Sequence, residues 1–161
     1  MATGRIRRWA GRLRRRRAAT GVTSQAAYRG DFEGRARIEY SPRADGDADP
    51  GEVVWAWVPY EEDPSRGKDR PVLVLARAGE DLLGLMLTSK DHTGDPRRGR
   101  PGGPVWLDVG TGAWDRQGRP SEVRLDRVLR LAPSAVRREG AALDRARFEQ
   151  VAAAVRETNG W

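Results

Sequence analysis

Short apolar runs, each bounded by turn-forming residues, dominate the middle of the chain. Their length and their β-branched and aromatic content predict buried strands and not helices. The predicted strands span residues 53–58, 71–76, 82–87, 105–109 and 123–131. A strand tolerates proline at its first position, where Pro71 stands, and the last run can break near Asp126. A short turn joins the second and third runs, which predicts a hairpin around residues 77–81.

The pattern changes to a helical period at the C-terminal end of the chain. Between residues 144 and 157, apolar side chains recur on one helical face. They are Phe148, Val151, Ala152 and Val155. Asp144 is the expected N-cap, and Asn159–Gly160 the expected stop. Several short strands followed by one helix predict an α+β, mainly β fold: a small antiparallel barrel with a C-terminal helix packed on it.

The positive charge is concentrated in the first 30 residues, which hold nine arginines and no acidic residue, whereas the whole chain carries a net charge of +7. Such a composition predicts a disordered basic arm over residues 1–30 that can contact nucleic acid. An anionic membrane surface is an alternative partner for the arm. Residues 31–50 are predicted to be a linker with a possible edge strand at residues 37–40, and residues 51–158 the compact domain.

Composition excludes several classes of site. The absence of cysteine excludes disulfides, thiolate zinc sites and cysteine nucleophiles, and the single histidine excludes a histidine-based metal cage. No apolar run approaches the roughly 18 residues that a membrane span needs, and no secretory signal follows the basic N-terminus. We therefore expect a cytoplasmic protein with no metal, no cofactor and no membrane span.

Polar side chains gather where two of the predicted strands meet their loops. They are Lys68 and Arg70 before the second strand, and Thr88, Ser89, Lys90 and His92 after the third. A hairpin brings these two groups to the same end. A guanidinium, ammonium groups, hydroxyls and an imidazole together suit a phosphodiester ligand. Alternatively, these side chains have only structural roles. Arg70 then pairs with a nearby surface acid, and the hydroxyls form hydrogen bonds with the backbone of the turn. The acids close to Arg70 in the sequence are Glu61, Glu62, Asp63 and Asp69.

Three segments follow one another in the order of a known family pattern. Residues 51–55 have the form Gly-[Asp/Glu]-x-[Val/Ile]-Trp, residues 69–75 contain an Arg-Pro strand, and residues 84–89 form a strand that ends in Thr-Ser. Residues 121–128 are similar to the later strand that leads to the closing helix. About half of the chain therefore resembles the PemK/MazF endoribonuclease toxins of type II toxin–antitoxin systems.

The resemblance implies an SH3-like barrel, a homodimer, cleavage of single-stranded RNA without metal, and a cognate antitoxin that covers the RNA groove. Arg70 corresponds to the family's active-site arginine and Thr88 to its active-site threonine, with Ser89 beside it. Many members carry a glutamate five residues before this arginine, where the present chain has Ser65.

The implied reaction is attack by an RNA 2′-hydroxyl on its own phosphodiester. Arg70 would stabilise the phosphorane charge, and Thr88 and Ser89 would hold the phosphate. Lys68, Lys90 and His92 would contact the RNA, and either His92 or a loop carboxylate would accept the proton. The alternative function is a nuclease-dead module that binds nucleic acid or a peptide on the same barrel.

Overall fold

The computed structural model describes residues 28–161, so the predicted basic arm lies almost entirely outside the described residues. The strands are β1 (Tyr28–Asp31), β2 (Glu52–Pro59), β3 (Gly67–Ala78), β4 (Asp81–Thr88), β5 (Trp106–Gly110), β6 (Ser121–Arg124), β7 (Leu129–Leu131) and β8 (Val136–Ala142). A 3-10 turn, η1 (Pro133–Ala135), precedes β8, and α2 (Arg145–Asn159) follows it. The prediction of an α+β, mainly β fold with a C-terminal helix is confirmed.

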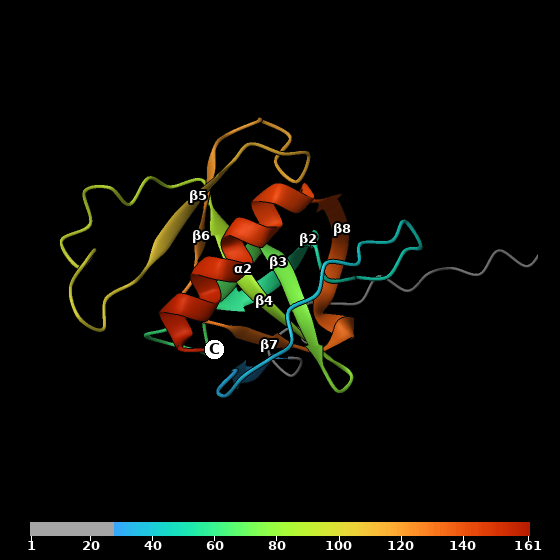
Figure 1. The fold of residues 1–161 in the computed structure, drawn as a ribbon, viewed down its shortest axis with the longest axis horizontal. Coiled ribbons are helices and arrows are strands. Elements are labelled where there is room, and N and C mark those ends of the chain that lie inside the picture. The colour runs from blue at the N-terminus through green and yellow to red at the C-terminus, as the bar shows by residue number, and fades with distance from the viewer. Residues whose placement is uncertain (1–27) are drawn as a thin grey trace, which may run out of the picture.

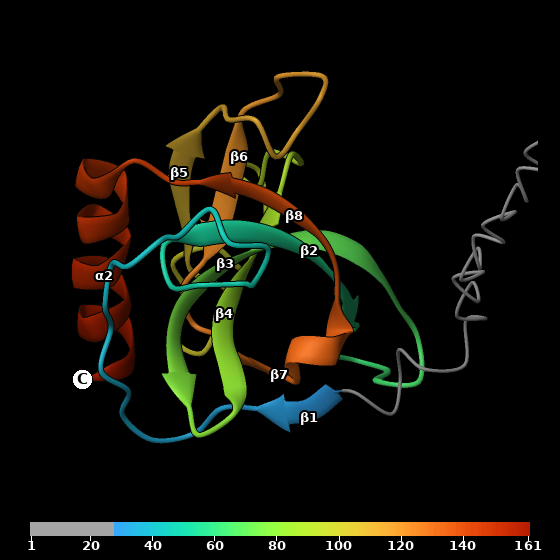
Figure 2. The same cartoon turned by 90° about the vertical axis from the view of Figure 1, so that its right-hand side faces the viewer.

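All strand pairs in the described part of the chain are antiparallel. The strand order is β1-β7-β4-β3-β2-β8, and β6 pairs with β4 and carries β5 at its other side. β4 therefore contacts β3 on one side, and β7 and then β6 on the other. The sheet curls into a half-open barrel with β1 and β8 at its two ends, and α2 packs across one face (Figures 1 and 2).

The β3–β4 hairpin is the centre of the fold. Successive residues of β3 point into two different apolar cores: Leu73 and Leu75 face the core that includes the helix, and Val72 and Val74 face the second core. Every residue of β4 is buried. Burial on both faces explains why these strands are continuous apolar runs and do not alternate with polar residues.

The structure corrects several predicted boundaries. β3 begins at Gly67, so Pro71 lies inside the strand and not at its first position. The β4 register begins at Val72, so the part of β3 that holds Pro71 is paired with β2 alone, and an edge tolerates proline. Residues 37–40 form no strand, and the sequence did not predict β1 or β8. The expected break near Asp126 is confirmed, because β6 ends at Arg124 and β7 begins at Leu129.

α2 closes one face of the barrel. Its N-cap is Asp144, whose carboxylate accepts a hydrogen bond from the Arg147 backbone N–H at 3.0 Å. Gly160 ends the helix with φ of 68°, a left-handed conformation that glycine adopts readily. The predicted apolar face is confirmed: Phe148, Val151, Ala152 and Val155 are all buried. Within residues 28–161, no helix has the length and apolar character needed to cross a membrane.

Candidate functional site

The strand register places Arg70 and Thr88 together. Val72 of β3 lies opposite Met86 of β4, and both contribute to the second core. Side chains two positions apart on a strand share a face, so Arg70 and Thr88 continue the same face toward the open end of the hairpin. The predicted meeting of these two residues at one end of the hairpin is therefore seen in the structure.

Two adjoining pockets meet at this point. We call them the Ser89 pocket, of about 200 Å³, and the His92 pocket, of about 370 Å³. Lys68, Arg70 and Thr88 line both. The remaining predicted residues divide between them: Ser89 lines the first, and Lys90 and His92 line the second. Each of the six candidate residues thus lines at least one of these two pockets.

Arg70 is half-buried and makes no hydrogen bond or ion pair with any residue that the structure describes. Two of the four acids that could have paired with it are used elsewhere: Asp69 bonds Arg137 at 3.1 Å, and Glu61 bonds Arg124 at 2.7 Å. Burial lowers the pKa of Arg70. The charge of Arg127 lowers this pKa further, whereas Tyr60 raises it. A guanidinium without a carboxylate partner is free to bind an anion.

Both lysines of the candidate site add positive charge to it. The pKa of Lys68 is lowered, chiefly by the neighbouring charge of Arg70, then by partial burial and by Lys90. Positive neighbours that lower the pKa of a lysine indicate a locally positive surface. This surface suits the phosphates of a nucleic acid strand.

Thr88 and Ser89 differ in their surroundings. Thr88 is only 9% exposed, and its Oγ1 accepts a hydrogen bond from the Lys90 backbone N–H at 3.2 Å. The hydroxyl therefore helps to shape the turn after β4, and it lines both pockets. Ser89 is exposed at the rim. Either hydroxyl can donate to a bound phosphate, since a hydroxyl carries one donor and two acceptor positions.

Ser65 lies in an exposed turn away from this centre. Its backbone N–H and its Oγ both bond Oδ1 of Asp63, at 3.1 and 2.5 Å. Neither residue is among those that line the Ser89 or the His92 pocket, whereas Glu61 and Glu62 line the latter. The position that often holds a glutamate therefore contributes no carboxylate here.

The imidazole of His92 is fixed by contacts with neighbouring residues and is not a freely solvated loop side chain. Its ring stacks on Trp106 of β5 with a centroid distance of 3.9 Å and an interplanar angle of 4°. Its Nδ1 lies 2.9 Å from Oε2 of Glu122 on β6, and the same oxygen accepts the His92 backbone N–H at 3.2 Å. Sequence reasoning did not find Glu122, because only the β4–β6 pairing brings it opposite Thr88.

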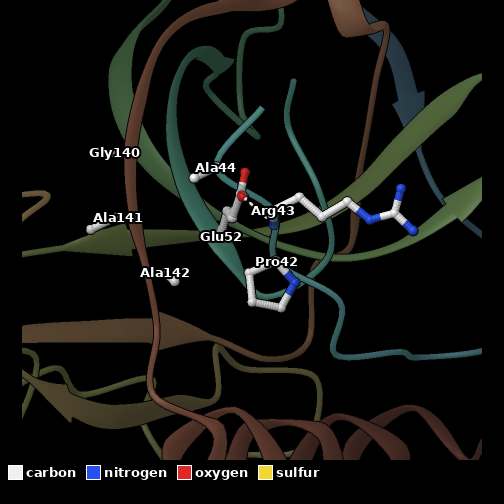
Figure 3. Close-up of a pocket in the computed structure, with 7 residues that line it drawn as sticks. All are labelled: Pro42, Arg43, Ala44, Glu52, Gly140, Ala141 and Ala142. Atoms are coloured by element: carbon white, nitrogen blue, oxygen red, sulfur yellow. Dashed lines mark hydrogen bonds between the residues drawn. The ribbon is translucent and has the colours of Figure 1, made fainter. Parts of the chain in front are cut away.

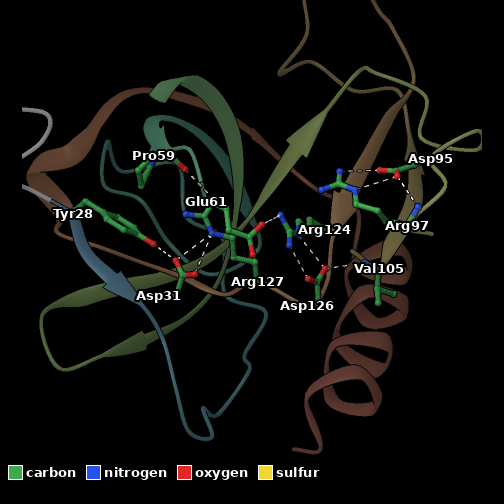
Figure 4. Close-up of polar contacts among 10 residues, drawn as sticks. All are labelled: Tyr28, Asp31, Pro59, Glu61, Asp95, Arg97, Val105, Arg124, Asp126 and Arg127. Carbon is green, nitrogen blue, oxygen red and sulfur yellow. Dashed lines mark hydrogen bonds and ion pairs between the residues drawn. The ribbon is translucent and has the colours of Figure 1, made fainter. Parts of the chain in front are cut away.

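Arg124 and Arg127 also line the His92 pocket. Figure 4 shows their polar contacts. Arg124 bonds both Asp126 and Glu61, at 2.8 and 2.7 Å. Burial alone would lower the pKa of Arg124, but these two bonds raise it above its ordinary value. Arg127 donates to the Pro59 carbonyl at 3.0 Å and to Asp31 of β1 at 3.2 Å. The similarity of residues 121–128 to a family strand was the signal that could have identified both arginines.

A further pocket lies away from these residues, between the segment 42–44 and the end of β8 (Figure 3). Its single carboxylate, Glu52, accepts hydrogen bonds from the backbone N–H groups of Arg43 and Asp49, both at 3.0 Å. The carboxylate thus stabilises the loop. The lining contains no hydroxyl, lysine or histidine, so this pocket offers less chemistry than the Arg70 region.

Comparisons with known proteins give matches to solved structures and to one family model. One crystal form of MazE–MazF from Deinococcus radiodurans matches with 20% identity and a TM-score of 0.50, over 72% of this chain and 98% of that chain. A second form matches with 21% identity and a TM-score of 0.49, over 70% and 96%. No curated protein matches the sequence. The family model of the PemK-like, MazF-like toxins matches residues 49–158. That match spans more than half of the sequence, and the chain therefore belongs to the PemK/MazF family of type II toxin–antitoxin toxins.

Proposed function

We propose that this protein is a metal-independent endoribonuclease that cleaves single-stranded RNA by attack of a 2′-hydroxyl on the adjacent phosphodiester. The observation that carries the proposal is the half-buried Arg70, which has no acidic partner in the described structure and lies beside Thr88 where two pockets meet. Membership of a family of endoribonuclease toxins supports the assignment. The products would be a cyclic phosphate and a free 5′-hydroxyl.

Each group around the junction has a role in this reaction. The Arg70 guanidinium would bind two phosphate oxygens and stabilise the charge that develops on them in the transition state. The hydroxyls of Thr88 and Ser89 would donate to the same phosphate. Lys68 and Lys90 would bind the neighbouring phosphates, because both side chains are exposed at the rim. Only RNA has the attacking hydroxyl, so DNA would not be a substrate.

The test uses purified protein and a pool of single-stranded RNA in EDTA, followed by mapping of the cut site. A matched oligonucleotide then carries one 2′-deoxynucleotide immediately 5′ of the scissile phosphate. We expect cleavage of the RNA in chelator and no cleavage of the deoxy-substituted strand, because the nucleophile has been removed. Cleavage of the substituted strand would contradict the proposed mechanism.

The second candidate function is a nuclease-dead binding module. The observation that favours it is Ser65, which replaces a family carboxylate and lies outside the pockets that Arg70 lines. Salt-dependent RNA binding by well-folded protein, with no cleavage of any strand in the pool, would assign this function and reject the nuclease.

We also propose that the protein acts in the cytoplasm as a homodimer, and that an antitoxin with an acidic segment covers the His92 pocket. Its lining includes Lys68, Lys90 and Arg70, which complement such a segment in charge. A structure that resembles the chain is of MazE with MazF, which supports a partner of this kind. Native mass spectrometry of the protein with its co-expressed partner tests both assemblies. A purely monomeric mass with no bound partner would contradict them.

A further inference from the structure

We propose that His92 is the catalytic base of the cleavage reaction and that Glu122 is the residue that positions it. This inference rests on the proposed function and names the group that accepts the 2′-hydroxyl proton. It starts from the paired side chains themselves: His92 is 12% exposed and Glu122 is 9% exposed, so the contact between them is shielded from solvent. A protected carboxylate–imidazole pair at the edge of a pocket is an arrangement suited to general-base catalysis.

The contacts leave one ring nitrogen available. Nδ1 faces Oε2 of Glu122 at 2.9 Å, so in the neutral ring the tautomer with its proton on Nδ1 donates to the carboxylate. The lone pair then lies on Nε2, which has no hydrogen-bond partner among residues 28–161. His92 lines the same pocket as Arg70 and Thr88. The proposal therefore places the 2′-hydroxyl of a phosphodiester held by these two residues within reach of Nε2.

Three contacts fix the ring. Trp106 stacks on it, the Glu122 side chain holds Nδ1, and the same Glu122 oxygen holds the His92 backbone. Glu122 itself lies opposite Thr88 in the β4–β6 register, and its other oxygen accepts from Arg98 at 3.4 Å. The strand that presents Thr88 therefore also determines where the imidazole stands. A base on a rigid support is more effective than one on a free loop.

The proton and electron balance is simple. The 2′-hydroxyl proton moves to Nε2 of His92 while the 2′-oxygen forms a bond to phosphorus. The bond between phosphorus and the 5′-oxygen breaks, and its electron pair leaves with that oxygen, which takes a proton from water. His92 then returns its proton to solvent. This step needs a carboxylate only as a support for the imidazole, so the serine at position 65 is compatible with activity.

Several charged groups surround the imidazole. Glu122 faces it from β6, Arg98 bonds Glu122 from the loop before β5, and Lys90 and Arg70 line the same pocket. Two aspartates of the loop also interact electrostatically with the ring: they are Asp91 and Asp95. Trp106, the contact from β5, is uncharged. A general base must be unprotonated to act, so kcat of the wild type should fall under acidic conditions.

The experiment measures steady-state cleavage of the mapped RNA by the full-length wild type and by His92→Ala, Glu122→Gln and Glu149→Gln. We expect His92→Ala to lower kcat by about 10²–10⁴-fold, to lose the acid limb of the pH profile, and to recover part of its rate in added imidazole. Glu122→Gln should lower kcat less than His92→Ala does, with KM unchanged. Glu149→Gln is the matched control, which makes the same change at an exposed carboxylate of α2 that lines neither pocket, and it should retain the wild-type rate.

Circular dichroism and urea unfolding establish that each variant is folded, and His92→Gln replaces His92→Ala if the alanine variant is not. If a folded His92 variant cleaves RNA at the wild-type rate, His92 is not the base, and the proposed function still stands. A loss that imidazole does not restore, with the acid limb retained, shows that His92 is only structural and also overturns it. Absence of cleavage by the wild type overturns both proposals.

Discussion

Replacement of Arg70 by alanine is expected to reduce RNA cleavage by about 10²–10³-fold, the scale for removal of one preorganised donor to transition-state charge. The reason is that Arg70 is half-buried beside Thr88 and has no described acidic partner, so its charge is directed at the ligand and not at the protein. Single-turnover rates in EDTA measure the loss. Arg70→Lys should restore only part of the rate, because an ammonium keeps the charge but loses the bidentate fork.

Arg37→Ala is the matched control for this prediction. The Arg37 side chain is 90% exposed and bonds Glu39 in the segment before β2, away from the candidate pockets. Its loss should leave cleavage unchanged. If folded Arg70→Ala cleaves RNA at the wild-type rate, Arg70 is not the phosphate-stabilising residue.

Replacement of Phe148 by alanine is expected to destabilise the fold by about 3–5 kcal/mol. Phe148 is 1% exposed, is part of the core between α2 and the sheet, and contacts the Tyr40 ring at a centroid distance of 5.1 Å. Its removal leaves a cavity that the surrounding strands and helix cannot readily fill. The free energy of unfolding in urea measures the effect.

Glu149→Ala provides the comparison on the same turn of α2. Glu149 is exposed, and substitutions at such sites usually change stability by no more than about 0.5 kcal/mol. A loss in Phe148→Ala no greater than that in Glu149→Ala would show that α2 is not anchored through this side chain.

The extent to which the sequence predicts this fold depends on how local the determining contacts are. β2, β3 and β4 are predictable because each contains a run of mostly buried apolar residues, which is visible without knowledge of its neighbours. β8 could not be predicted, because its sequence mixes arginine, glutamate, glycine and alanine. Its strand conformation comes from pairing with β2. β1 is short and polar, and pairing with β7 makes it a strand.

The candidate site divides in the same way. The meeting of Arg70 and Thr88 follows from one hairpin, so it could be predicted from the apolar runs alone. The absence of a carboxylate partner for Arg70 could not be predicted in this way, because it depends on other strands: Asp69 pairs with Arg137 of β8, and Glu61 pairs with Arg124 of β6. The contact between His92 and Glu122 was equally inaccessible, since it depends on the β4–β6 register.

The β3–β4 hairpin also bears on the order in which the chain can assemble. Its strands are joined by the two residues Gly79 and Glu80, so the loop that must close is short and its entropic cost is low. β2 pairs with β8 only after the chain has been synthesised through Ala142. The hairpin that brings Arg70 and Thr88 together can thus form early on a growing chain. The ion pair between Asp69 and Arg137, which keeps Asp69 from pairing with Arg70, can form only after β8 has been synthesised.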